Sequence, residues 1–429
     1  MHQNSTNYIR AILNYILNKE FFLVIAARFI QLLGSFLVLK ILSTQLTIIE
    51  FGHYSLVLSI LTLISLLPFS AFDQGVVRYV SIYRDKGIFN YFYSNCFIPY
   101  FALLAVYTLF WIVLSQTVLL DSYWSTILWA LPVFISSEII KTSYLMIEYF
   151  DRERLFTLVT ISIEFSLKCL SPIAIKFYSK SLSTLDVLSV FAVINLLILL
   201  MTFYKRRQSL RISLIKTKYI RIFNSRIFKF SYPLLTWAIF GWLQSMGNRW
   251  FLNLYSTKEM VAKYSLLSSV ANIPTTAIIA IVSGYIVPII YQKENEKRGF
   301  ASSFLKITIP SLSVILTCFV VIFHLFSYEI ITIISNENYA SISKYLPVLL
   351  FSNSLVILAD ISTYEIYAHN QTRRLIRSKI FPGMFSLIFG LILTKNYGLH
   401  GAITNHLLTN IILAALILNT TIKYNREAK

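Results

Sequence analysis

Twelve apolar stretches, each about as long as a membrane-spanning helix, most constrain what this chain can fold into. A helix needs about 20 apolar residues to cross a bilayer at a rise of 1.5 Å per residue. The connections between the stretches are mostly short, so no soluble domain of about 50 residues fits between them. The stretches cover approximately residues 20–42, 50–72, 90–115, 124–147, 156–178, 183–204, 228–253, 262–290, 303–325, 345–367, 375–395 and 398–422.

The composition indicates that lipid is the solvent for most of the chain. Of its 429 residues, 56% are hydrophobic and 13% are charged, whereas soluble domains carry about 25% charged residues. We therefore predict an all-α polytopic membrane protein with about 12 transmembrane helices. The cysteines lie far apart within apolar runs, so we expect no metal site and no disulfide framework. They are Cys96, Cys169 and Cys318.

Basic residues on the connections predict the orientation in the membrane. With the N-terminus inside, the inside segments hold 25 Lys and Arg and the outside loops hold about five. Cytoplasmic loops carry such an excess, so we expect both termini to be cytoplasmic. Residues 205–226 carry eight Lys and Arg and no acid. We interpret this block as a cytoplasmic anchor, part of which could lie as an amphipathic helix on anionic lipid, and not as a nucleic-acid site.

A short repeat divides the chain into two halves. Residues 43–60 read "STQLTIIEFGHYSLVLSI" and residues 256–270 read "STKEMVAKYSLLSSV", with Tyr54 and Tyr264 separated by 210 positions. Each half contains six predicted spans, so both halves have the same orientation. We predict two six-helix bundles, residues 1–204 and 228–429, related by a pseudo-two-fold axis along the membrane normal and joined by a basic cytoplasmic linker, 205–227.

Two pairs of opposite charges lie inside predicted spans. Glu138 and Lys141 are three positions apart, and Glu164 and Lys168 are four apart. Residues at these spacings share one helix face, so each pair can neutralise itself, and we interpret them mainly as structural pairs. Ionisable residues in a membrane are also functional candidates. Lys141 and Lys168 are therefore candidates for binding an anionic substrate, and Glu138 and Glu164 for coupling to an ion.

Four further ionisable residues lie inside spans without an opposite charge three or four positions away. Arg28 and Arg249 suggest a polar interior that attracts an anion, and snorkelling to the headgroups is the alternative for Arg249 and Lys306. Asp360 could pair with Arg28 across the bundle, or it could bind a coupling cation or proton. We predict that the cations of this chain form a path for a phosphate-bearing substrate. The candidates are Arg28, Arg249, Lys141, Lys168 and Lys306.

The chain resembles the polysaccharide transporter family, the Wzx-type O-antigen flippases of the MATE-like MOP superfamily. Three segments carry the resemblance: "EFGHYSLVLSILTLIS", "NRWFLNLYSTKEMVAKYSLLSSVANIP", and "FDQGVVRYVSIYRDKG" at residues 72–87. The family often has Asp-Arg where this chain has Asn248-Arg249, so a role for that acid does not carry over. The resemblance implies contacts of Arg28 and Arg249 with pyrophosphate or acidic sugar, and ion coupling at Asp360.

The resemblance implies a flippase of the bacterial inner membrane. Its substrate would be an undecaprenyl-pyrophosphate-linked oligosaccharide, moved from the cytoplasmic to the periplasmic leaflet by alternating access, with no cofactor. Membrane lipids are expected partners, and a polysaccharide polymerase and a chain-length regulator are candidate protein partners. One alternative is a MATE-type drug exporter, which would usually have acids in its cavity. Another is a membrane polymerase or glycosyltransferase, but the longest outside loop has about 19 residues and no catalytic group is evident.

Overall fold

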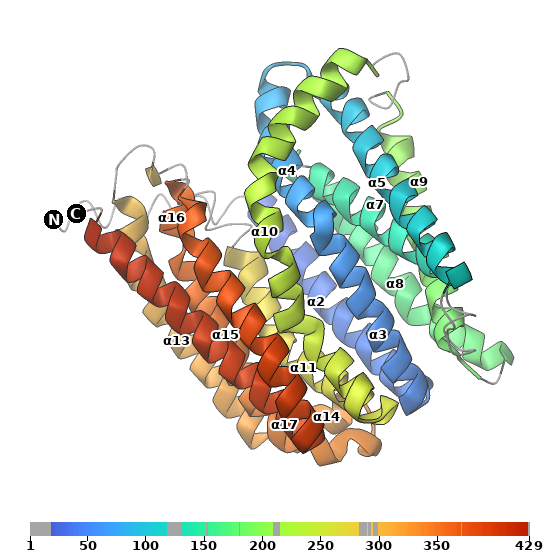
Figure 1. The fold of residues 1–429 in the computed structure, drawn as a ribbon. Coiled ribbons are helices and arrows are strands. Elements are labelled where there is room, and N and C mark those ends of the chain that lie inside the picture. Colours follow the sequence, from blue (N-terminus) through green and yellow to red (C-terminus); the bar gives the residue numbers. More distant parts are fainter. Residues whose placement is uncertain are drawn as a thin grey trace.

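Long helices run from residue 19 to residue 427 in the computed structural model of the protein (Figure 1). The structure describes residues 19–117, 130–151, 153–179, 181–208, 215–282, 290, 293–294, 299–369 and 371–427. No strand occurs in these ranges. The predicted fold class, an all-α polytopic membrane protein, is confirmed.

We name two groups of helices by the half of the sequence to which they belong. The first group, the N-half, consists of α2 Lys19–Gln45, α3 Ile48–Ile64, η1 Ser65–Ser70, α4 Ala71–Asp85, α5 Phe89–Thr117, α7 Ala130–Phe150, α8 Arg154–Ser179 and α9 Thr184–Lys205. The second group, the C-half, consists of α10 Thr217–Tyr255, α11 Lys258–Ile281, α13 Phe300–Leu325, α14 Ser327–Ile334, η4 Glu337–Tyr345, α15 Leu346–Ser362, α16 Tyr364–Ala368, η5 Thr372–Leu375 and α17 Ile376–Glu427.

Every predicted span coincides with a described helix or with part of one. Within the described ranges, nine helical segments are long and apolar enough to cross a membrane. This number is smaller than twelve partly because the last two predicted spans are joined in α17. The helices α10 and α11 are not among the nine.

Three helices differ from the predicted boundaries. The regular helix α3 ends at Ile64 and continues as a π-helical turn, in which Leu67 has φ −120° and ψ 108°. Pro68 explains this change, because proline lacks an N–H and clashes with the preceding turn. The helix α10 begins at Thr217, inside the predicted linker. In α17, Gly398 has φ 54° and ψ −128°, which turns the chain between the two predicted spans.

The repeated sequence forms the same local structure in both halves. Thr47 caps α3 and Thr257 caps α11, each accepting a hydrogen bond at its hydroxyl from the backbone N–H three residues later, at 3.2 and 3.3 Å. Tyr54 and Tyr264 each lie seven residues beyond the cap and are buried. The two helices are therefore equivalent elements of the two halves.

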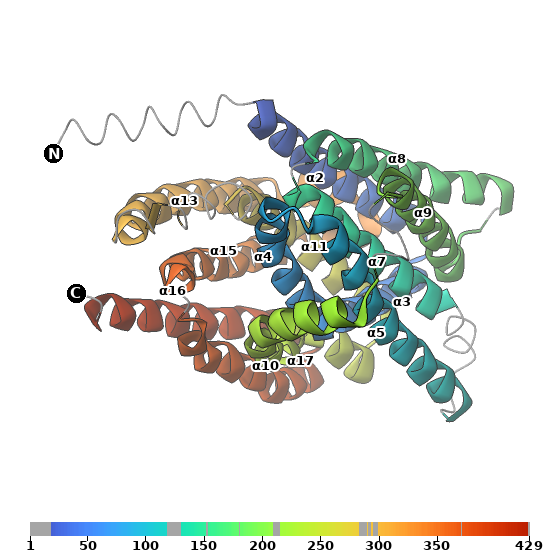
Figure 2. The same ribbon diagram turned by 90° about the horizontal axis from the view of Figure 1, so that it is seen from above.

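The ends of the helices define two faces. The Glu427 face carries the end of α9, the start of α10 and the end of α17 (Figure 1). The Gly398 face carries the α2–α3 and α10–α11 junctions, α14 and the turn in α17. Seen from above, α13, α15 and α17 lie on one side and α7, α8 and α9 on the other, with α11 between them (Figure 2). Residues 209–214, where the amphipathic linker segment is predicted, lie outside the described residues.

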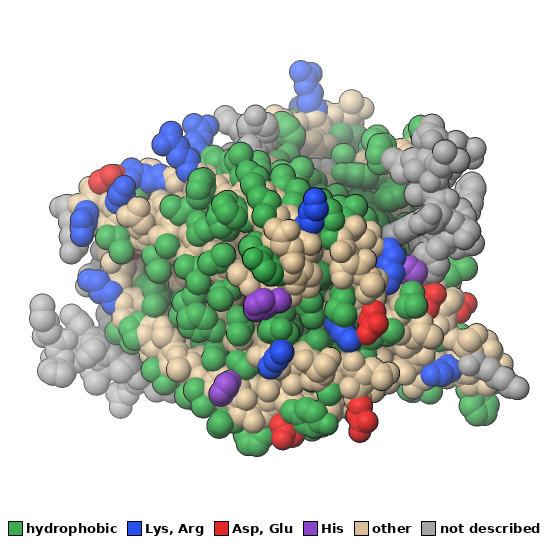
Figure 3. All heavy atoms as spheres, turned by 60° about the horizontal axis from the view of Figure 1, so that its bottom comes forward, with side chains coloured by type: hydrophobic (Ala, Val, Ile, Leu, Met, Phe, Trp, Pro, Cys, Tyr) green, Lys and Arg blue, Asp and Glu red, His purple; other side chains and the backbone are tan. Residues whose placement is uncertain are grey.

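Large apolar side chains cover much of the surface that Figure 3 shows, which looks mainly onto the Gly398 face. Exposed members include Phe29 on α2, Leu109 on α5, Leu200 on α9 and Ile307 on α13. A contiguous apolar surface of this size would aggregate in water but is matched by acyl chains. The protein is therefore a multi-pass membrane protein.

Candidate functional site

Four charged side chains form one buried ion network in the N-half. The Lys141 ammonium on α7 lies 2.8 Å from Glu138 Oε1, 2.5 Å from Glu164 Oε1 and 3.0 Å from Asn195 Oδ1. The Lys168 ammonium on α8 lies 2.7 Å from Glu164 Oε1 and 3.3 Å from Glu138 Oε2. The two predicted pairs are thus joined across α7, α8 and α9 into a network without net charge.

The four charged groups of this ion network neutralise one another, as the interpretation of the two pairs as structural requires. Lys141 is 3% exposed and Glu164 is 6% exposed, so their mutual attraction offsets a large loss of hydration. Each ammonium already has two carboxylate partners, and an anionic substrate would have to compete with them. A coupling proton or cation would likewise have to displace a lysine from Glu138 or Glu164.

Arg249 lies near the end of α10, where the two halves meet. It is 6% exposed, and its Nη1 donates to the backbone oxygen of Ser55 on α3 at 3.3 Å. Its Nε makes no hydrogen bond, and it forms no ion pair with a carboxylate of the described part of the chain. The next residue, Trp250, donates from its indole to Ser59 Oγ at 2.8 Å. Arg249 is therefore a buried cation at the junction of the halves.

Asparagine, histidine, serine and tyrosine side chains form a second polar network, which lies in the C-half between α10, α11, α15 and α17. Asn405 donates to Asn248 Oδ1 at 2.8 Å, and Asn248 donates to the Tyr264 hydroxyl at 3.1 Å. His406 lies 3.3 Å from the same hydroxyl and 2.8 Å from Asn353 Oδ1. This amide network continues through Asn272, Asn410, Ser352, Ser386 and Gln244.

The amide network was not predicted from the sequence, although a signal was present. His406 and Asn410 lie four positions apart in an apolar run of α17 and so share one helix face, with Asn405 directly before them. Ionisable residues alone do not indicate such a face, because amide and serine side chains are polar but carry no charge. These side chains satisfy one another in the membrane interior, where an unpaired polar group is costly.

Three of the predicted site residues lie away from both networks. On α2, Arg28 Nη1 donates to Gln31 Oε1 at 2.8 Å. On α13, Lys306 lines a cavity of about 270 Å³ near the Glu427 face, together with Glu365, Ser362, Thr421 and Asn425. The pairing of Asp360 with Arg28, one of the two alternatives for this residue, does not form. Asp360 Oδ1 instead accepts from the Lys379 ammonium at 2.7 Å, because α15 packs against α17. The structure therefore does not bring the five predicted cations into one cluster.

Two further ionic clusters lie at the Glu427 face. Arg206, directly after α9, donates to both oxygens of Glu148 at 2.8 and 3.0 Å and also contacts Asp151. Burial alone would lower the pKa of Arg206, but Glu148 and Asp151 raise it above its ordinary value. This cluster attaches the end of α9 to α7.

The second cluster lies before α13 and is centred on Glu294. Its carboxylate accepts from the N–H groups of Gly299 and Ala301 at 2.8 and 2.7 Å and lies 3.0 Å from His369 Nε2. Burial alone would raise the pKa of Glu294, but these hydrogen bonds lower it below its ordinary value of 4.5. Glu294 therefore caps α13 as a carboxylate.

The two halves approach each other closely at Gly52, near the Gly398 face. A Cβ atom at Gly52 would lie 2.4 Å from the Lys258 carbonyl oxygen and 3.6 Å from the Ala262 nitrogen on α11. Ala262 lies 210 positions after Gly52, the spacing of the repeat, so equivalent residues of the halves meet here. On α2, Ser43 also donates to the Ile334 carbonyl at 3.3 Å. These contacts close the junction at the Gly398 face.

Comparisons with known proteins agree with this architecture. A family model described as "Polysaccharide biosynthesis protein" matches residues 17–294. No curated protein sequence matches the chain. An inward-facing multidrug resistance MATE family transporter of the MOP superfamily is similar in structure, with TM-score 0.70, 11% identity, and 93% of this chain and 95% of that chain covered.

Two other solved structures are similar over most of their lengths. The lipid II flippase MurJ in an inward closed conformation has TM-score 0.67 and 14% identity, covering 91% of this chain and 86% of that chain. A mutant of the Vibrio cholerae MATE transporter VcmN has TM-score 0.69 and 14% identity, covering 99% of this chain and 98% of that chain. At these identities the likeness establishes the fold.

Proposed function

Because the chain belongs to the polysaccharide biosynthesis protein family, we propose that this MOP-type transporter is a flippase for lipid-linked oligosaccharide. The substrate is an oligosaccharide, such as an O-antigen repeat unit, carried on undecaprenyl pyrophosphate. The protein moves it from the cytoplasmic to the periplasmic leaflet of the bacterial inner membrane, without acting as an enzyme. Arg249 is the observation that carries the proposal, because it is a buried guanidinium without an ion pair among the described residues at the junction of the halves.

The chemistry of Arg249 suits a pyrophosphate. A guanidinium presents five N–H donors in a planar fork and can bind two phosphate oxygens at once. The Nε of Arg249 makes no hydrogen bond, so donor capacity remains. A guanidinium in surroundings of low dielectric constant attracts a phosphate more strongly than one in water. The ammonium groups of Lys141 and Lys168 are occupied by carboxylates, and we assign them to holding the N-half together.

We propose that the Glu427 face is cytoplasmic and that the Gly398 face is periplasmic. The excess of Lys and Arg on the predicted inside segments, 25 against about five, supports this orientation. The close contact of Gly52 with Lys258 then closes the periplasmic side, and the substrate enters from the cytoplasmic side. Rocking of the halves about their pseudo-two-fold axis would expose Arg249 to one side and then the other.

The test is replacement of Arg249 in a strain that lacks the chromosomal gene. We expect Arg249→Ala to abolish surface polysaccharide and to leave lipid-linked repeat units in the cytoplasmic leaflet, whereas Arg249→Lys restores part of the export. Arg221→Ala is the matched control, because Arg221 lies on the same helix but is exposed. Full export by the Ala variant at normal expression would refute the proposed role of Arg249. No change in repeat-unit distribution on deleting the gene would refute the function itself.

A second candidate is a drug exporter, because two of the similar structures are MATE transporters. A site for cationic drugs needs accessible carboxylates. However, Glu138, Glu164 and Asp360 each contact a lysine ammonium in this structure. Tolerance to cationic drugs should therefore be the same with and without the gene. A loss of tolerance on deletion, with intact surface polysaccharide, would favour the exporter instead.

A further inference from the structure

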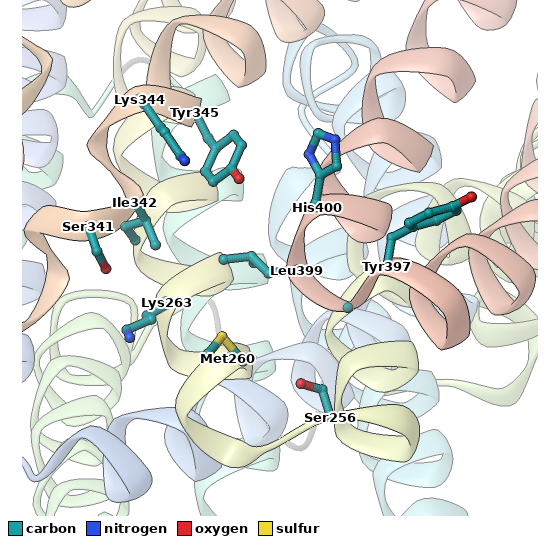
Figure 4. A pocket seen from close by; sticks show the side chains of 11 residues that line it. Ser256, Met260, Lys263, Ser341, Ile342, Lys344, Tyr345, Tyr397, Leu399 and His400 are labelled. Carbon is teal, nitrogen blue, oxygen red and sulfur yellow. The ribbon is translucent and has the colours of Figure 1, made fainter.

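Three segments of the C-half line an open pocket at the Gly398 face. The segments are the start of α11, the η4–α15 junction and the turn in α17 (Figure 4). The pocket has a volume of about 370 Å³, within the range of small-molecule sites. We call it the Gly398 pocket. Its lining residues are Ser256, Met260, Lys263, Ser341, Ile342, Lys344, Tyr345, Tyr397, Gly398, Leu399 and His400.

The turn at Gly398 shapes one wall of this pocket. Its φ of 54° is in the left-handed region, which favours glycine, and a Cβ there would meet nothing within 4 Å. The backbone conformation therefore explains why glycine occupies this position. The turn points Leu399 toward the other lining side chains and places His400 across from Tyr345, whereas the Tyr397 ring points away from them (Figure 4).

Aromatic rings and lysines give the pocket its chemistry. The Tyr345 ring lies between Lys344 and His400, with Lys344 Nζ 5.1 Å from its centroid and the His400 ring centroid at 5.9 Å (Figure 4). Lys263 pairs with Glu259 at 2.6 Å, whereas Lys344 forms no ion pair with a carboxylate of the described residues. The lining itself contains no carboxylate.

We propose that the Gly398 pocket binds an acidic saccharide, a sugar unit that carries a carboxylate or phosphate. A sugar ring has an apolar C–H face that packs on aromatic rings and a hydroxyl edge for partners such as Ser256 and Ser341. Lys344 supplies the charge that selects an acidic sugar over a neutral one. This inference rests on the proposed function, in which this face is the one where the oligosaccharide leaves.

The pocket is lined by residues of the C-half alone, at the Gly398 face, where α10 ends, α11 begins and α17 turns. It would therefore contact the glycan and not the pyrophosphate, which the proposed function assigns to Arg249. Binding of the leading sugars at the exit face would favour release on the periplasmic side. The same pocket could instead bind a free acidic saccharide that is not linked to lipid. Export measurements distinguish the lipid-linked ligand from the free one.

The binding experiment uses the purified full chain in lipid nanodiscs. Saturation-transfer NMR with D-glucuronate as the probe measures affinity, with D-glucose as the neutral match and acetate as the plain anion. We expect glucuronate to bind more tightly than both. Lys344→Ala should weaken it about tenfold or more, as for loss of a charge-assisted hydrogen bond. Lys395→Ala is the matched control, because Lys395 is exposed near the same turn but does not line the pocket.

Three results would overturn the inference. The first is absence of saturable glucuronate binding to the unmodified protein. The second is equal affinity of the Lys344→Ala variant and the unmodified protein. The third is acetate binding as tightly as glucuronate, which would indicate a general anion site.

Export by the same variants identifies the source of the saccharide and separates this inference from the proposed function. Slower export by Lys344→Ala, but not by Lys395→Ala, supports binding of the lipid-linked unit. Normal export together with lost glucuronate binding supports a site for free saccharide. If the unmodified protein binds glucuronate but moves no lipid-linked unit, the flippase proposal fails and the pocket stands. Normal flipping without any binding refutes the pocket alone.

Discussion

The contact at Gly52 predicts that one added methyl group shifts the balance between the two open states of the protein. A Cβ at this position would lie 2.4 Å from the Lys258 carbonyl oxygen, so α3 and α11 must separate by about an ångström. Overpacking of this kind costs about 1–3 kcal/mol. That cost applies only while the Gly398 face is closed, so the population open at this face should rise roughly 5- to 150-fold.

Gly241→Ala is the matched control for Gly52→Ala. Both glycines lie within helices, but a Cβ at Gly241 meets nothing within 4 Å. Each substitution gains about 1 kcal/mol of helix propensity, so the difference between them isolates the contact with α11.

Pulsed electron–electron double resonance can measure the change in the separation of the halves. Spin labels at the exposed residues Ile49 on α3 and Tyr328 on α14 report the separation of the halves at the Gly398 face. The background must lack Cys96, Cys169 and Cys318, which are free thiols. We expect a longer distance population in Gly52→Ala that is absent in Gly241→Ala. Identical distance distributions in the two variants would refute the reasoning.

Three further predictions concern stability. Glu164→Gln should lower the free energy of unfolding by about 3–5 kcal/mol, because it leaves two buried ammonium groups with one carboxylate. Thermal unfolding in detergent tests this prediction. Glu329→Gln is the control, because Glu329 is exposed. Since the pKa of Glu294 is lowered in the folded protein, its stabilisation is present above about pH 4.5 and is lost as the pH falls through the folded pKa. The melting temperature of Glu294→Gln should thus lie below that of the unmodified protein at pH 7, and a gap that stays constant in acid would contradict this. Gly398→Ala should cost about 1–3 kcal/mol through backbone strain and weaken glucuronate binding; unchanged stability would contradict the role of its positive φ.

The helices could be predicted from the sequence because a bilayer imposes a minimum apolar length on each span. The positions of charges within single helices could be predicted for the same reason, and Glu138 with Lys141 and Glu164 with Lys168 do form ion pairs. Periodicity fixes which residues share a helix face. It does not fix which faces of different helices meet.

The contacts between helices were accordingly the part that the sequence did not determine. The bonds of Lys141 to Glu164 across α7 and α8, and of Asp360 to Lys379 across α15 and α17, depend on packing between helices. The amide network is a further case, since neutral side chains such as Asn405 and His406 matter only once they face one another. The sequence therefore identified candidate charges for a site but not their partners.

The path of α10 has a mechanical consequence. Its last turns belong to the C-half, but its first turns pack against α4 and α5, where Phe223 contacts Tyr83 and Phe92 and Tyr219 contacts Tyr91. The helix α10 thus contacts both halves. Any rotation between the halves must either bend α10 or separate the aromatic residues of its first turns from α4 and α5. Rotation of the halves in the proposed transport cycle would therefore work against these aromatic contacts, whatever the substrate.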